Sequence, residues 1–342
     1  MTVKTKTFKT RLNRFNKVPE GLLDCEANQL YKILDGPALI ILKGRSEEHL
    51  FISVLLHGNE TTGWDAVRDL LIKYQDSVLP RSLCLFIGNV TAAKEAQRVL
   101  PGQQDFNRIW CKETLAANPL ANEVLNVIAD LKLFAAIDVH NNTGKNPHYG
   151  CVNKLEPAFI HLATLFSRTV VYFIKPDTVM SIAMSNYCPS VTIECGQPGQ
   201  ARGTQHALEY LDACLHLSHF PEHPLATHDV DLFHTVATVR IAESVSIGFA
   251  DDDADIELLP DIDRLNFNEI PAGTAIGKVK ANKIKVLNVR DEQGNDVSSR
   301  FFEIHDSWIL SRRQVMPSML TLNINIIKQD CLCYLMERIS LK

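Results

Sequence analysis

Long apolar runs, sequence repeats and an excess of basic residues are all missing from this sequence. No stretch of about 18 apolar residues occurs, so we expect no transmembrane helix. The N-terminus is basic but has no apolar core of the kind that a secretory signal needs. A net charge of −5 gives no reason to expect nucleic-acid binding, and it argues against an anionic membrane surface as a partner.

Paired cysteine motifs are also missing. The nine cysteines are scattered, their number is odd, and no Cys-x-x-Cys occurs. Several lie inside apolar stretches, as Cys84 does, and Cys331 and Cys333 fit a segment that packs inward. We therefore interpret them as small buried hydrophobes in a reducing compartment, and we favour the cytoplasm.

The composition is that of an ordinary globular protein. The 342 residues suffice for two domains or one large one, and 46% are hydrophobic against 22% charged. Strands are expected at residues 38–42, 50–56, 83–87, 134–139, 169–174 and 190–193, and helices at 62–74, 118–131, 157–167 and 204–219. This alternation predicts an α/β domain with a largely parallel central sheet, whose ligands bind beyond the carboxyl ends of the strands.

The pattern changes after about residue 221, where prolines and histidines mark a linker. Strands are expected at residues 236–241, 244–249, 276–279 and 284–289, and the apolar segment 319–339 is expected to pack back on a core. We therefore divide the chain into a domain of residues 1–225 and a small β-rich C-terminal domain of residues 226–342.

Two strand ends carry residues that suit zinc. His57 and Glu60 follow one apolar strand with Gly58 between them, and His140 ends another. Two imidazole nitrogens and a carboxylate leave a fourth position open for water, as in catalytic zinc sites. His-x-x-Glu alone describes a polar loop at least as well, and His140 is what favours zinc. Asp138, on the same side of the strand as His140, is placed to orient its imidazole or to serve a structural hydrogen bond.

A third strand end and a separate loop carry further reactive groups. Glu194 ends an apolar strand, and a carboxylate there can take a proton from water and pass it to a leaving amine; the alternative is a solvated acid. Asn107 and Arg108 can hold a carboxylate through an amide and a guanidinium fork. Arg98 can stabilise the oxyanion formed when water attacks a carbonyl. Taken singly, each arginine also fits a surface salt bridge.

Taken in their order along the chain, these motifs resemble the zinc carboxypeptidase-like superfamily, and more narrowly its succinylglutamate desuccinylase/aspartoacylase branch. The resemblance spans roughly residues 36–220. The matching stretches are His57-Gly-Asn-Glu60, Gly88-Asn89 with Asp105-Phe-Asn-Arg108, Ile137-Asp-Val-His140 and Thr192-Ile-Glu194.

The resemblance implies an α/β/α sandwich with a mixed, largely parallel central sheet, followed by a β domain over the active site. It also implies one zinc per chain on the three ligands named above, with Glu194 as general base and then general acid. Arg98 would polarise the scissile carbonyl, while Asn107 and Arg108 would hold the substrate's carboxylate.

Two departures from the family pattern concern the substrate. Relatives usually place the polarising arginine closer to the asparagine than Arg98 lies to Asn107 here. Aspartoacylase-like members carry another arginine shortly before the catalytic glutamate, for the second acid group of their substrate, where this chain has Met184. No Arg or Lys occurs between Lys175 and the catalytic glutamate.

We therefore expect a zinc-dependent amidohydrolase that cleaves an amide bond in a small substrate with a free carboxylate, most directly an N-acyl amino acid. Lys145, His148 and Tyr149 are candidates for substrate contacts, with a well-bonded loop as the equal alternative. The rival functions are a metallocarboxypeptidase for short peptides and a non-catalytic zinc-binding module, although a pure binder would not need Glu194. We expect no nucleic-acid or membrane partner, and a homo-oligomer is one possibility.

Overall fold

The computed structural model describes residues 11–249, 253–280 and 286–340. The first ten residues, which we searched for a secretory signal, lie outside these ranges, as do residues 284 and 285 of a predicted strand. Among the described residues, no helix is long and apolar enough to cross a membrane.

A large mixed sheet runs through the molecule in the order β1-β2-β4-β3-β5-β8-β6-β7-β9-β17-β16, and β13 pairs with β9 beside this path. Its strands are β1 (Asn13–Phe15), β2 (Ala38–Leu42), β3 (Ser46–Val54), β4 (Arg81–Ile87), β5 (Leu133–His140), β6 (Tyr149–Val152), β7 (Thr169–Tyr172), β8 (Ser190–Glu194), β9 (Asp231–Ile241), β13 (Leu287–Asp291), β16 (Met316–Ser318) and β17 (Cys333–Arg338). The four strands β4, β3, β5 and β8 are parallel to one another, and β2 and β6 flank them in the opposite direction.

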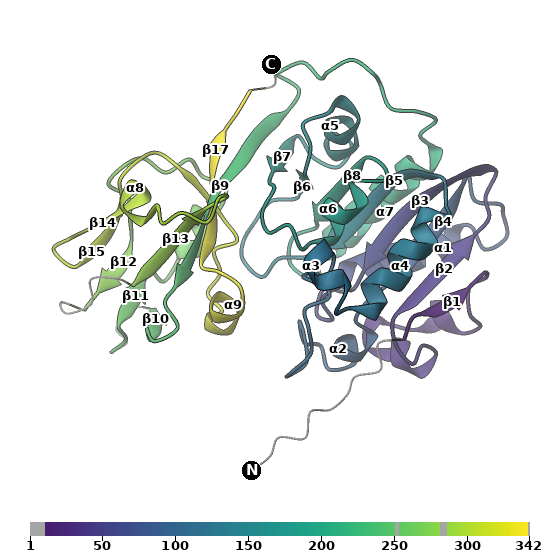
Figure 1. Ribbon diagram of the computed structural model, residues 1–342, viewed down its shortest axis with the longest axis horizontal. Helices are drawn as coiled ribbons and strands as arrows, with labels where there is room; N and C mark the ends of the chain where they lie inside the picture. The colour runs from purple at the N-terminus through teal and green to yellow at the C-terminus, as the bar shows by residue number, and fades with distance from the viewer. Residues whose placement is uncertain (1–10, 250–252, 281–285, 341–342) are drawn as a thin grey trace, which may run out of the picture.

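Helices cover both faces of this sheet (Figure 1). The α-helices are α1 (Thr62–Lys73), α2 (Val90–Lys94), α3 (Lys112–Leu115), α4 (Pro119–Ala129), α5 (Pro157–Thr164), α6 (Met180–Met184), α7 (Ala201–His216), α8 (Ser298–Phe301) and α9 (Ile324–Gln329). One core lies between the sheet and α1, α5 and α7, and a second lies between the sheet and α4 and α6. The predicted α/β/α sandwich is therefore confirmed.

Strand β3 shows why the apolar runs form the centre of the sheet. Leu50, Ile52 and Val54 point into the first core, whereas Phe51 points into the second. Successive side chains of a strand alternate between faces, so a strand covered by helices on both sides is apolar throughout. Ser53 is the polar exception, and it lies beside Asp138 of β5 in the strand register.

The parallel direction of β3, β5 and β8 brings their carboxyl ends to one edge of the sheet. His140, the last residue of β5, is the direct register partner of Glu194, the last residue of β8. His57 and Glu60 follow β3 at the same edge. The three strand ends that the sequence singles out therefore meet, as the rule for ligand sites in parallel sheets requires.

The C-terminal part is rich in β-structure and forms a second lobe (Figure 1). Its smaller sheet has the order β10-β11-β12-β15-β14, with strands β10 (Ile247–Phe249), β11 (Ile256–Leu258), β12 (Ala275–Val279), β14 (Phe302–His305) and β15 (Trp308–Ser311). A third core joins this sheet to β9, β13 and β17. The predicted boundary at residue 225 falls between α7 and β9, and the large sheet continues across it because β7 pairs with β9.

Candidate active site

Three buried side chains at the sheet edge could hold a metal ion. Ligand atoms of His57, Glu60 and His140 all lie within 4.8 Å of one another. Each oxygen of the Glu60 carboxylate faces one imidazole: Nδ1 of His57 and Nδ1 of His140 lie 2.7 Å from Oε1 and Oε2, respectively. Two imidazole nitrogens and a carboxylate form a donor set that zinc favours.

A sharp turn after β3 aims His57 and Glu60 at the same point. Leu55 has a φ of 56°, a left-handed conformation that costs energy for a side chain of this kind. Gly58 follows in a place where a Cβ atom would meet the backbone nitrogen of Ala93 at 2.2 Å. The chain after β3 therefore packs directly against α2, and only glycine fits between them.

The variant Gly58→Ala should lower the free energy of unfolding by about 1–3 kcal/mol, because backbone atoms must move to admit the methyl group. Chemical denaturation measures this change, and zinc affinity should fall with it because the turn carries two proposed ligands. Asn59→Ala in the same turn is the control and should change stability by less than about 0.5 kcal/mol. An unchanged Gly58→Ala protein would contradict the packing.

The outer nitrogen of each histidine faces a further carboxylate. His57 Nε2 lies 3.1 Å from Asp105 Oδ1, and His140 Nε2 lies 2.9 Å from Asp138 Oδ2. The Asp138 contact was predicted from its spacing, and Ser53 donates a hydrogen bond of 2.6 Å to the other oxygen of this carboxylate. Metal-binding histidines usually have such a partner, which fixes the ring and increases its basicity.

The charges around the two rings fit a divalent cation. Burial alone would raise the pKa of Glu60, but His57 and His140 hold it well below its usual value. Burial alone would likewise lower the pKa of His140, but Asp138 and Glu60 raise it well above its usual value. Together with Asp105, Glu60 and Asp138 place three carboxylates around the two imidazoles, an arrangement that favours a cation between them. The residues present therefore fit zinc.

Glu194 lies beside this group and is buried. Burial raises its pKa to about 7, with a further contribution from the negative charge of Glu60. Asn142 donates a hydrogen bond of 2.8 Å to Glu194 Oε2, which leaves Oε1 without a side-chain partner among the described contacts. A carboxylate with a pKa near neutrality can accept and return a proton at physiological pH.

The two predicted arginines are held together by an acid from the C-terminal part. Asp330 Oδ1 lies 3.3 Å from Arg108, and Asp330 Oδ2 lies 3.6 Å from Arg98. Arg98 also faces Glu60 at 3.5 Å and Asp105 at 3.4 Å. Arg98 therefore lies against a proposed metal ligand despite its unusual spacing from Asn107.

Asn107 makes its contacts within the protein. Its Nδ2 lies 3.4 Å from His140 Nε2, and its Oδ1 accepts a hydrogen bond of 3.0 Å from the backbone of Met180. Arg108 donates to the Asn107 carbonyl. In this structure Asn107 fixes the loop that carries Arg108 against the metal group, and its amide borders the cavity described next.

One cavity of about 760 Å³, its open mouth included, joins these groups. Besides the three proposed ligands, its polar lining consists of Arg98, Asn107, Arg108, Asn141, Tyr149, Lys175, Thr192, Glu194, Thr235, Ser318, Asp330 and Tyr334. Its apolar lining consists of Cys151, Val171, Phe173, Pro176, Val179 and Met319.

Of the three remaining residues that were predicted to contact the substrate, the structure places only one at the cavity. Tyr149 lines the cavity. Lys145 does not; its exposed amine lies 3.3 Å from Asp263. His148 stacks on Phe166 and His206 outside the cavity lining. Met184, at the position where some relatives carry an arginine, is buried in the second core and does not reach the cavity.

Among the site residues that were not assigned a role from sequence, four make contacts that bear on the chemistry or line the cavity. Asp105 stands next to Phe-Asn-Arg, so its place in that motif was a usable signal. Asn142 directly follows the strand end at His140 and Asn141, but nothing local shows that it reaches Glu194. Asp330 and Tyr334 come from the C-terminal part and have no local signal at all.

The sandwich fold and the His-Glu-His group at the carboxyl ends of its strands define a domain of the zinc carboxypeptidase-like class. Residues 46–214 match the model of the succinylglutamate desuccinylase/aspartoacylase catalytic domain. This part of the chain, just under half of its length, therefore belongs to the succinylglutamate desuccinylase/aspartoacylase family.

Solved structures with this fold include three that cover most of the chain. Succinylglutamate desuccinylase from Vibrio parahaemolyticus has 15% identity and a TM-score of 0.56, over 87% of this chain and 83% of its own. Murine aminoacylase 3 has 16% identity and a TM-score of 0.53, over 87% of this chain and 97% of its own. The succinylglutamate desuccinylase/aspartoacylase from Rhodobacter sphaeroides has 14% identity and a TM-score of 0.58, over 87% of this chain and 88% of its own. No curated protein matches the chain.

Proposed function

We propose that this protein is a zinc-dependent hydrolase that removes the acyl group from an N-acyl amino acid. The observation that carries the proposal is the buried carboxylate of Glu194 beside the group His57, Glu60 and His140, in one cavity with two arginines. The names of the relatives, desuccinylase and aminoacylase, agree with it. A bound zinc ion supplies Lewis-acid activation of water and of the substrate's carbonyl.

The protein's own groups perform the remaining steps. Glu194, oriented by Asn142, accepts a proton from the attacking water and later passes it to the leaving nitrogen. Arg98, next to Glu60, is placed to stabilise the negative charge that develops on the carbonyl oxygen. Arg108 binds the substrate's carboxylate, with Asn107 fixing the loop that carries it.

The proposal is tested by assaying the zinc-loaded full-length protein on N-acetyl and N-acyl amino acids and on unblocked dipeptides, with release of free amine as the signal. We expect hydrolysis of the acyl amino acids and little of the dipeptides. Cleavage of dipeptides alone would indicate a metallocarboxypeptidase instead. A protein that binds zinc and hydrolyses nothing would be a binding module, which would overturn the proposal.

Asp330 should compete with the substrate for Arg108, because its carboxylate already lies against that guanidinium. In the Asp330→Asn variant we expect KM to fall by about 3–10-fold, since removal of a charge-assisted contact is worth about 1 kcal/mol or more. The control is Glu303→Gln, which removes a half-exposed carboxylate outside the cavity. A higher KM would show instead that Asp330 positions the arginines for binding.

Three expectations from the sequence stay predictions. The cytoplasmic location rests on the cysteines, all nine of which are free thiols in the structure. The absence of nucleic-acid and membrane partners rests on charge and composition. The oligomeric state is open to measurement by light scattering.

A further inference from the structure

Building on the proposed function, we propose that the preferred substrates carry a single carboxylate and an otherwise apolar body, as N-acetylated leucine or phenylalanine do. Dicarboxylic compounds such as N-acetylaspartate should be poor substrates. The proposal is based on the apolar side chains that line the cavity and on the pairing of its cations.

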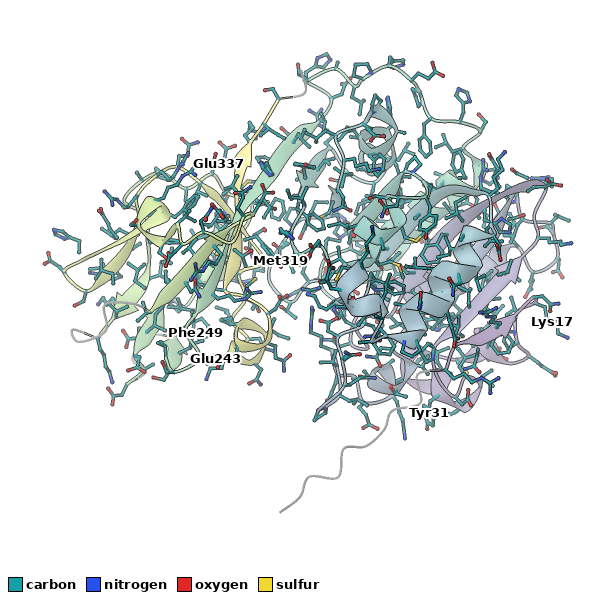
Figure 2. All side chains as sticks on the ribbon, viewed as in Figure 1. Lys17, Tyr31, Glu243, Phe249, Met319 and Glu337 are labelled. Atoms are coloured by element: carbon teal, nitrogen blue, oxygen red, sulfur yellow. The ribbon has the colours of Figure 1, made fainter. Side chains whose placement is uncertain are left out.

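Part of the cavity lining is apolar, and we call this part the apolar wall. Val171 and Phe173 belong to the end of β7 and the residues after it, Val179 precedes α6, and Met319 follows β16. Figure 2 shows Met319 between the two lobes. Cys151 completes the wall, and burial raises the pKa of its thiol well above the usual value, so this group is neutral.

The wall continues into a small hydrophobic cluster. Val171 and Cys151 pack there with Phe233 and two methionines, Met316 and Met336. Phe173 packs against the same cluster. An apolar substrate group placed on this wall would extend an existing core, and removing its surface from water would stabilise the complex.

Cations that could receive a second carboxylate are already paired. Arg98 faces three acids, and Arg108 faces Asp330. The third cation of the cavity lining is Lys175, whose amine lies 2.5 Å from Asp177 and whose side chain is 49% exposed. Among the described residues that line the cavity, no other lysine or arginine occurs.

A substrate with one carboxylate can use Arg108 by displacing Asp330. A second carboxylate would then lie against the apolar wall, or near the negative charges of Glu60 and Asp330. The hydroxyl groups of Thr235 and Ser318 can donate hydrogen bonds to it, but neutral donors compensate a buried charge only in part. The same position accepts a leucine or phenylalanine side chain without this desolvation cost.

The test compares kcat/KM of the zinc-loaded full-length protein on matched substrates: N-acetylleucine and N-acetylphenylalanine against N-acetylaspartate and N-succinylglutamate. We expect the apolar substrates to be preferred by at least about 100-fold, as for a carboxylate left unpaired in a buried site. Preference for the acidic substrates overturns this inference and leaves the proposed function intact. Hydrolysis of none of them overturns the proposed function, and this inference with it.

Two variants identify the cause of the selectivity. Phe173→Arg adds a cation to the wall and should shift the ratio of kcat/KM values at least about 10-fold toward the acidic substrates, whereas the matched Phe173→Gln should not. Lys175→Met should change the ratio by less than about 3-fold, because this amine is exposed and paired. A selective loss of activity on acidic substrates in Lys175→Met would show that Lys175 binds a second carboxylate, and would overturn the inference.

Discussion

The variant Glu194→Gln should lose about 10²–10⁴-fold in kcat while keeping its zinc, because general acid–base catalysis contributes about this much to the rate. Gln matches Glu in shape, and its amide oxygen can still accept the hydrogen bond that Asn142 donates. The variant therefore removes proton transfer and little else. Zinc content is measured by mass spectrometry, and kcat by release of the free amino acid.

The control for this variant is Glu209→Gln, which changes an exposed carboxylate on α7 and should leave kcat unchanged. A Glu194→Gln protein with full activity would show that another group transfers the proton. A variant that is inactive because it no longer binds zinc would show that Glu194 acts mainly on the metal site.

The pH profile provides a second measurement on the same group. Burial raises the pKa of Glu194 to about 7, whereas a bound cation nearby favours the carboxylate and lowers this value. The base acts only when it is deprotonated, so kcat/KM should fall as the pH drops through the pKa of Glu194. In Glu194→Gln this acid limb should disappear, which a structural change alone would not produce.

The centre of the site could be predicted because each part has a local signal. His57, His140 and Glu194 each stand at or just after the end of an apolar strand, and parallel strands bring such ends to one edge of a sheet. The contact between Asp138 and His140 follows from the two-residue period of a strand. The fold class followed from the same alternation of strands and helices.

The outer part of the site could not be predicted, because it depends on distant strand pairing. Asp330 reaches Arg98 and Arg108 because β17, just after it, pairs with β9, and β9 pairs with β7. No local pattern specifies that pairing. Strand β6 was also missed: it is four residues long and follows a polar segment that reads as a loop. Its first residue, Tyr149, was nevertheless among the predicted substrate contacts.

The structure places Arg98 beside the metal group although its spacing departs from the family pattern. Arg98 lies farther from Asn107 along the chain than family relatives would suggest, yet its guanidinium faces both Glu60 and Asp105. The residues around Gly102, whose φ is 78°, form a turn between Arg98 and Asp105. The contact between Asp105 and His57 fixes the residues that follow this turn beside the metal group.

The largest effect is expected from His140→Ala, which should abolish zinc binding and reduce activity by more than about 10³-fold. Three protein ligands are the minimum in catalytic zinc sites, and the variant leaves only His57 and Glu60. The carboxylates of Glu60 and Asp138 would then face each other without the imidazole that now separates them. Zinc content after dialysis, and the rise in Tm on adding zinc, both measure the loss.

Two further variants make this result specific. His148→Ala removes a histidine that stacks on His206 and is not among the proposed ligands, so it should keep one zinc per chain. Asp138→Asn keeps all three ligands but weakens the partner of His140, and should lower zinc affinity by about 10–100-fold. A metal centre at this edge therefore requires a graded loss of zinc affinity. The loss should be largest in His140→Ala, smaller in Asp138→Asn and absent in His148→Ala. A His140→Ala protein that retains one tightly bound zinc would place the metal elsewhere.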